Sequence, residues 1–207
     1  MKRHPLLAVL FTAVSLVTAC VSRAAQSDIS PVEASPLFVV EPIYRTMGPF
    51  SEGLALAAVG DKVGYIDASG TVVIEARFDG AGTFSNGLAV VNIGGDHCFI
   101  DKTGTVVIST PYDWLEPFTD ERALFREGDR YGFIDRQGAV VVEAVYDKAI
   151  PFSEGLAAVM VGGQWGYIDR EGTPVIGPHF EEARPFSGGV AEVKVGGKWG
   201  VIKSPLK

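Results

Sequence analysis

The sequence predicts an all-β protein built from tandem 34-residue repeats, and three observations support this prediction. A phenylalanine recurs with a constant spacing of 34 residues, at Phe50, Phe84, Phe118, Phe152 and Phe186. Glycine recurs in the same register, at Gly60, Gly94, Gly128, Gly162 and Gly196. The 25 glycines, 12 prolines and 10% aromatic residues suit many short strands joined by tight turns. A fixed period of this size is typical of repeat architectures, in which each unit buries its apolar face against a neighbour.

The fourth unit, residues 152–185, illustrates the elements expected in each repeat. Residues 156–161 and 164–169 are two apolar runs separated by Gly162-Gly163, which predicts a β-hairpin whose turn needs positive φ. Asp169 and Gly172 then fit the first and fourth positions of a type I turn. A third strand follows at residues 173–176. Each unit is therefore predicted to be a three-stranded antiparallel meander, with room for a short fourth strand before the next unit.

The middle strand of each unit should present two different faces, because side chains alternate along a strand. Trp165 and Tyr167 share one face of the fourth unit, and Gly166 and Ile168 share the other. The glycine leaves room for close approach by a neighbouring backbone or ring. We expect Trp165 and Trp199 to pack between units. An isoleucine in every unit predicts a continuous apolar seam, formed by Ile66, Ile100, Ile134, Ile168 and Ile202.

The two ends of the array complement each other in sequence. Residues 41–49 match the tail of a unit, whereas the fifth unit lacks that tail. Such a permuted arrangement would allow a closed, propeller-like ring of five units. However, 34 residues is short for a four-stranded propeller blade, which takes about 40. We therefore expect an open, twisted array, with the closed five-unit ring as the alternative.

The N-terminus has the features of a targeting segment. Lys2 and Arg3 precede an apolar run over residues 6–19, which is too short to span a bilayer but suits a signal peptide. Residues 16–20, Leu-Val-Thr-Ala-Cys, resemble the lipobox of bacterial lipoproteins. This resemblance implies removal of the signal peptide 1–19 and acylation of Cys20. The alternative is an ordinary cleaved signal.

Three regions follow from this division of the chain. Residues 20–37 comprise Cys20 and a polar segment that we interpret as a flexible tether, and residues 38–207 form the repeat domain, with units starting near 50, 84, 118, 152 and 186. Cys20 is followed by Val-Ser and not by aspartate. By resemblance to enterobacterial lipoproteins, this favours the periplasmic side of the bacterial outer membrane. A secreted or soluble periplasmic protein is the alternative location.

The repeat motif itself resembles that of a known family. Residues 163–169 read Gly-Gln-Trp-Gly-Tyr-Ile-Asp and follow Phe-Ser-Glu-Gly-Leu-Ala at residues 152–157. Repeated over residues 42–202, this block is similar to the bacterial WG-repeat family. The resemblance implies a scaffold with a binding function and no cofactor. The sequence departs from the motif at Val63-Gly64, His97-Cys98, Glu121-Arg122 and Tyr131-Gly132.

Few residues offer catalytic or metal-binding chemistry. An aspartate near a glycine turn in each of four units, at Asp67, Asp101, Asp135 and Asp169, is a candidate calcium ligand. One carboxylate per unit is too few for this hard cation, so we interpret these aspartates as turn caps. Adjacent strand residues point to opposite faces, so His97 and Cys98 should not form a nucleophile–base pair. We expect no catalytic residue, metal or cofactor.

Charge and aromatic residues indicate the class of partner. The net charge of −7 becomes −9 without residues 1–19, which contain two basic residues and no acid; this disfavours nucleic acid. Trp114 breaks the repeat pattern, so the expected interaction patch is Trp114, Arg122, Arg126, Arg130 and Tyr131. The sequence thus favours a non-catalytic, lipid-anchored scaffold that binds another envelope protein. A carbohydrate or peptidoglycan binder that uses exposed tryptophans is one alternative, and a hydrolase or hydrolase inhibitor is another.

Overall fold

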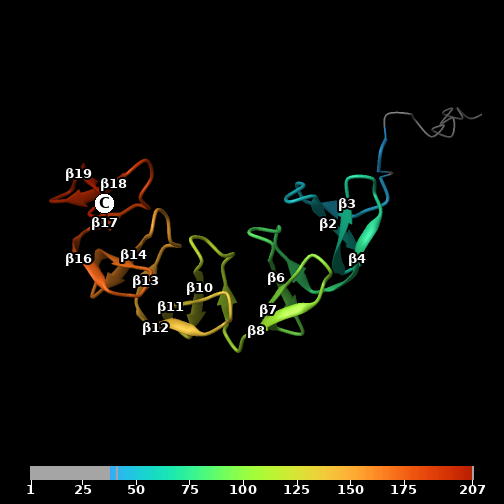
Figure 1. The fold of residues 1–207 in the computed structure, drawn as a ribbon, viewed down its shortest axis with the longest axis horizontal. Coiled ribbons are helices and arrows are strands. Elements are labelled where there is room, and N and C mark those ends of the chain that lie inside the picture. The colour runs from blue at the N-terminus through green and yellow to red at the C-terminus, as the bar shows by residue number, and fades with distance from the viewer. Residues whose placement is uncertain (1–37, 41, 207) are drawn as a thin grey trace, which may run out of the picture. The chain divides into compact units, whose positions relative to one another are not determined.

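The computed structural model describes residues 38–40 and 42–206, which form an all-β repeat domain. Five small antiparallel sheets follow one another in chain order (Figure 1). Within the described residues there is no helix, and hence none long and apolar enough to cross a membrane. The predicted signal peptide 1–19, Cys20 and the tether 20–37 lie outside the described residues.

The strands of each sheet are consecutive in sequence. The first sheet contains β1 (Thr46–Met47), β2 (Leu54–Val59), β3 (Lys62–Asp67) and β4 (Val72–Phe78). The second contains β5 (Gly80–Ala81), β6 (Ala89–Ile93), β7 (Asp96–Ile100) and β8 (Val106–Ser109). The third contains β9 (Trp114–Leu115), β10 (Ala123–Glu127), β11 (Arg130–Ile134) and β12 (Val140–Tyr146). The fourth contains β13 (Lys148–Ala149), β14 (Leu156–Val161), β15 (Gln164–Asp169) and β16 (Pro174–Phe180). The fifth contains β17 (Glu182–Ala183), β18 (Val190–Val195) and β19 (Lys198–Lys203).

The predicted meander is confirmed, with one addition at its start. A two-residue strand precedes each hairpin and pairs with the hairpin's first strand, as β13 pairs with β14. The short fourth strand therefore belongs to the sheet that follows it in sequence. In the first, third and fourth sheets the last strand is longer than expected, as β16 extends to Phe180 and not only to Ile176. The fifth sheet has three strands among the described residues.

The turns have the predicted chemistry. Gly162 and Gly163 adopt φ values of 58° and 82°, which are required by a two-residue hairpin turn of the primed type. In the next turn the Gly172 amide donates to the Asp169 carbonyl at 3.0 Å. The Asp169 carboxylate accepts hydrogen bonds from the amides of Glu171 and Thr173. The equivalent carboxylates of Asp67, Asp101 and Asp135 make the same bonds, so these aspartates cap turns.

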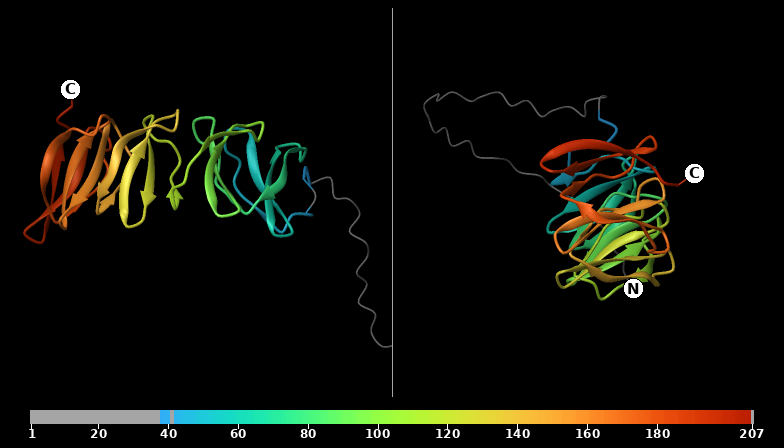
Figure 2. Two further views of the ribbon diagram at one scale, coloured as in Figure 1. Left: turned by 90° about the horizontal axis from the view of Figure 1, so that it is seen from below. Right: turned by 90° about the vertical axis from the view of Figure 1, so that its left-hand side faces the viewer.

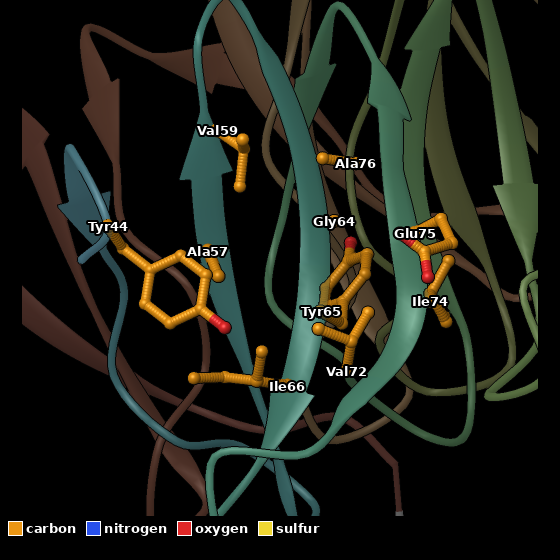
Figure 3. A pocket seen from close by; sticks show the side chains of 10 residues that line it. All are labelled: Tyr44, Ala57, Val59, Gly64, Tyr65, Ile66, Val72, Ile74, Glu75 and Ala76. Carbon is orange, nitrogen blue, oxygen red and sulfur yellow. The ribbon is translucent and has the colours of Figure 1, made fainter. Parts of the chain in front are cut away.

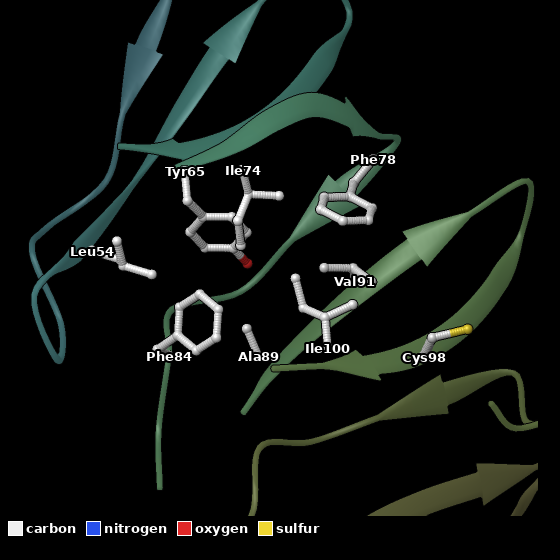
Figure 4. Close-up of a cluster of buried hydrophobic side chains, with 9 residues drawn as sticks. All are labelled: Leu54, Tyr65, Ile74, Phe78, Phe84, Ala89, Val91, Cys98 and Ile100. Carbon is white, nitrogen blue, oxygen red and sulfur yellow. The ribbon is translucent and has the colours of Figure 1, made fainter. Parts of the chain in front are cut away.

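The hydrophobic core lies between consecutive sheets. In each of the four seams an aromatic residue on a middle strand meets the repeated phenylalanine of the next unit, with ring centroids 4.7–4.8 Å apart, in the pairs Tyr65–Phe84, Phe99–Phe118, Phe133–Phe152 and Tyr167–Phe186. Figure 4 shows the first seam, where Leu54, Tyr65 and Ile74 face Phe84 and Ile100. The predicted isoleucine seam is buried in the first four units. Since both faces of an internal sheet are covered, each unit depends on its neighbours.

The two terminal sheets differ in how their outer faces are covered. Val40 and Tyr44 pack against Ala57 and Ile66 on the first sheet, beside a pocket shown in Figure 3. On the fifth sheet Trp199 is 46% exposed, so it does not pack between units as expected. No strand of the first sheet pairs with the fifth within the described residues. The array is therefore open, and the ring alternative is not what the structure contains (Figure 2).

Candidate interaction site

Three of the five residues of the expected patch form a row across the third sheet. Arg126 on β10 lies opposite both Trp114 on β9 and Tyr131 on β11. Residues directly opposite in antiparallel strands share a face of the sheet. All three side chains are half-buried. The structure thus brings an indole, a guanidinium and a phenol together on one face of the third sheet.

The other two residues of the expected patch lie elsewhere. The exposed Arg130 forms an ion pair with Asp147 at the hairpin end of the sheet. Arg122, at the opposite end of the hairpin, donates from Nε to the Arg170 carbonyl at 2.9 Å. Its side chain is only 16% exposed. Arg122 therefore ties the third repeat to the fourth, a use of arginine that the sequence did not predict.

A pocket that the sequence did not predict lies beside Trp114. Its volume is about 290 Å³, and it is bounded by Trp114 and Leu115 of the third repeat and by His97 of the second. The second sheet contributes the row Gly80, Asn92 and His97, which corresponds by the 34-residue period to Trp114, Arg126 and Tyr131. Gly80 and Asn92 are smaller than the residues at the same positions of the third to fifth repeats, so this row leaves space beside Trp114.

A change on the middle strand explains why the second repeat is irregular here. In the fourth repeat, a Cβ on Gly166 would lie 2.4 Å from the carbonyl oxygen of Ile176. The close approach arises because β16 bulges over this glycine, so that four residues of β16 span two of β15. In the second repeat Cys98 has a side chain at this position. There Cys98 pairs directly with Ser109 and β8 ends, which leaves His97 without a partner residue on β8.

Two buried polar atoms near the pocket have no hydrogen-bond partner within the described part of the chain. They are Nδ1 of His97 and Nε of Arg126. Such groups are rare in folded proteins, because burial without a partner costs about 1–3 kcal/mol. Both lie on the rows that form or adjoin the pocket. The only sequence signals for this site were the His97-Cys98 departure and the extra tryptophan at Trp114.

Two acidic groups close to the row in sequence have raised pKa values. Burial raises the pKa of the Glu116 carboxyl, which follows β9. Burial, and then the charges of Glu127 and Glu143, raise the pKa of Tyr112. Among the described residues, no group of three or more His, Cys, Asp or Glu side chains is placed to hold a metal ion. The row itself offers two aromatic rings for contact and a guanidinium for hydrogen bonding.

Comparison with known families identifies the repeat. The family model described as WG containing repeat matches residues 38–62, 64–95, 99–131, 131–165 and 165–199. These matches cover more than half of the chain, and from the second match on their first residues lie 32–35 residues apart. The chain belongs to the WG-repeat family. No curated protein matches this WG-repeat protein.

Solved structures resemble the WG-repeat protein in fold alone. A eukaryotic initiation factor matches with a TM-score of 0.50 and 14% identity, over 78% of this chain and 53% of that one. Kluyveromyces lactis Hsv2 has a TM-score of 0.49 and 9% identity, over 73% and 56% of the two chains. The N-terminal domain of Nup159 has a TM-score of 0.47 and 11% identity, over 73% and 52%. The WG-repeat protein spans about half the length of these structures.

Proposed function

We propose that this WG-repeat protein is a non-catalytic scaffold that binds another protein at the cell envelope, where a lipid on Cys20 anchors it. The observation that carries the proposal is the clustering of departures from the repeat. Residues that recur in every unit are used for turns and for packing between sheets. By contrast, Trp114, Arg126 and His97 stand at positions that vary between units, and they lie around or beside one pocket.

The composition of the site fits a protein partner. Tryptophan, tyrosine and arginine are the residues most enriched in the energetically dominant centres of protein interfaces. Trp114 and Tyr131 supply apolar area, and the half-buried Arg126 supplies a guanidinium that can donate to a carbonyl or carboxylate of the partner. The net charge of the chain disfavours nucleic acid, since phosphate neutralisation requires an excess of Lys and Arg.

Proximity labelling from the intact protein in its own envelope tests this proposal. Trp114→Ala combined with Arg126→Ala should remove a specific labelled protein. The matched control is Lys148→Ala combined with Met160→Ala, which changes the equivalent positions of the fourth repeat and should retain that protein. Identical labelling by the first variant and the wild type would overturn the site.

The lipid anchor is tested separately. Cys20→Ala should abolish palmitate labelling and release the protein from the membrane fraction, because the acyl chains supply about 0.8 kcal/mol per buried methylene. Ser22→Ala, two residues away, should leave both properties unchanged. Membrane partition that survived Cys20→Ala would contradict the anchor while leaving the partner site open to the previous test.

A carbohydrate binder is the second candidate, and exposed Trp199 favours it. Its ring lies on the outer face of the fifth sheet, with the Arg184 guanidinium carbon 4.8 Å from the ring centroid. Aromatic rings flanked by polar groups are suitable platforms for sugars. Cell-wall fragments should then change the tryptophan fluorescence, and Trp199→Phe should abolish the change. No change at saturating fragment would leave the protein-binding proposal alone.

A further inference from the structure

The fifth sheet has a free edge at the place where four other sheets carry a last strand. In the first, third and fourth sheets that strand passes so close to the middle-strand glycine that a Cβ would lie 2.4–2.5 Å from its backbone. At the equivalent Gly200 of β19 no atom lies within 4 Å of the same position. Gly200 therefore leaves space for a bulged strand, and the described residues after β19 do not form one.

The chain carries a matching strand sequence before its first sheet. Residues 38–40 and 42–44 read Phe-Val-Val and Pro-Ile-Tyr, and they align by the 34-residue period with Pro-Val-Ile and Pro-His-Phe of β16. Pro42 takes the place of Pro178, so a proline at this point is compatible with the bulged strand. The match to the WG-repeat family also begins at residue 38.

One side of this N-terminal segment already makes the contact that a last strand makes with the next repeat. A Val40 methyl group lies 3.2 Å from the Cβ position of Gly70. In the same way, Val142 of β12 lies 2.9 Å from the Cβ position of Gly172 in the next repeat. Its described residues, 38–40 and 42–44, belong to no strand, and Phe38 and Ile43 are 50% and 75% exposed. It is thus seated on the first sheet but lacks a strand partner.

We propose that the free edge of β19 binds the Phe38–Tyr44 segment of a second copy of this chain. The pairing of β15 with β16 sets the register: Trp199 lies opposite Tyr44, Val201 opposite Val40, and Ile202 opposite Phe38. This is strand addition to an exposed edge, in which main-chain hydrogen bonds provide the affinity. The contact is head-to-tail, so successive copies form a ring if the rotation closes and a filament if it does not.

A second copy fits better than the chain's own N-terminal segment. That segment lies against its own first sheet through Val40 and Tyr44, and no strand pairing joins the first and fifth sheets among the residues described. When the segment keeps these contacts with its own first sheet, its other edge is available to pair with a strand of another molecule. The contact then continues the stacking already present between repeats.

Two features make the association weak. The outer face of the fifth sheet carries an ion pair between Arg184 and Glu192, whereas the positions equivalent to Glu192 are Leu56, Val90, Leu124 and Ala158 in the other sheets. Burial of this pair costs desolvation. In the first repeat Lys62 forms an ion pair with Asp79. At the proposed contact the equivalent positions are Lys198 and Arg45, so two positive charges would face each other. Salt screens such repulsion, so added salt should strengthen the association.

Sedimentation velocity of the full chain with Cys20→Ala tests the proposal. Its mean mass should rise with concentration, and Glu192→Leu should shift that rise to lower concentration. Gly200→Val blocks the accepting edge, and Phe38→Asp with Ile43→Asp blocks the donating segment. Gly200 has open space and both apolar side chains are exposed, so these variants should fold, which circular dichroism checks.

The decisive sample is a mixture of the two blocked variants. Each variant alone should be monomeric, and a 1:1 mixture should double the mass without forming larger species, because only one edge and one segment remain. A wild type that stays monomeric at all concentrations, a Gly200→Val variant that assembles like the wild type, or a mixture without dimer would each overturn the proposal. None of these outcomes bears on the Trp114 site, which does not involve either end.

Discussion

The second and fourth repeats have the same length and the same turns, but their last strands differ. In the fourth repeat β16 bulges over Gly166 and continues to Phe180. In the second repeat Cys98 occupies the equivalent position, and β8 has no register shift between Cys98 and Phe99 and ends at Ser109. One side chain on a middle strand therefore decides whether the neighbouring strand can bulge.

This difference connects packing to the candidate site. Because β8 ends early, His97 is left beside a pocket bordered by Trp114, and its Nδ1 has no hydrogen-bond partner among the described residues. The fourth repeat covers the equivalent Trp165 by pairing it with Phe180. A repeat array can thus create a binding pocket by losing a regular contact in one unit while its neighbours keep the fold.

The largest expected effect comes from giving the fourth repeat a side chain like that of the second. Gly166→Val should lower the free energy of unfolding by about 3 kcal/mol, because its Cβ would overlap the Ile176 carbonyl. Urea denaturation measures the loss. Gly200→Val is the matched control, and it should change stability by less than about 0.5 kcal/mol because its site is open. Equal effects of the two substitutions would contradict the role of the bulge.

The reverse change should cost less. Cys98→Gly removes a buried thiol and adds a flexible residue to a strand, so we expect a loss of about 2 kcal/mol in urea denaturation. Cys98→Ala, which keeps the Cβ, should lose about half as much. If Cys98→Gly were more stable than the wild type, the glycine would be allowing β8 to bulge as β16 does.

A smaller effect is expected from hydrogen bonds that only some of the packed seams between sheets contain. The Tyr167 hydroxyl donates to the Arg184 carbonyl at 2.8 Å, whereas Phe99 of the second repeat has no hydroxyl. Tyr167→Phe should therefore lower the thermal stability by about 1 kcal/mol. Tyr65→Phe should do the same, because Tyr65 donates to the Gly82 carbonyl at 2.7 Å. Unchanged melting temperatures in both variants would show that these bonds are not stabilising.

The same phenol gives a pH dependence that is negligible at neutral pH. Burial raises the pKa of Tyr167 to about 12, above its unfolded value of about 10. Its contribution to stability is therefore complete below pH of about 10 and is lost as the pH rises through about 12. Urea midpoints measured between these pH values should fall less steeply in Tyr167→Phe than in the wild type. Parallel slopes would contradict the assignment.

Much of the fold could be predicted from sequence because its turns are local. The glycine pairs and the Asp169 turn follow from backbone conformation over a few residues, and the expected open array is what the structure contains. The patch was harder to predict. Trp114, Arg126 and Tyr131 meet through strand pairing, but Arg122 is drawn into the next repeat by the Arg170 carbonyl.

By itself, the sequence determined the period, the turns, the meander and the residues that pack in each seam, since these depend on short-range geometry and on alternation along a strand. Only the tertiary structure decided which sheet each short strand joins, where a strand bulges and which aromatic residues stay exposed. Trp165 and Trp199 stand in nearly identical local sequence, yet only Trp165 has a following sheet to cover it. Burial depends on a neighbour that the local pattern does not encode.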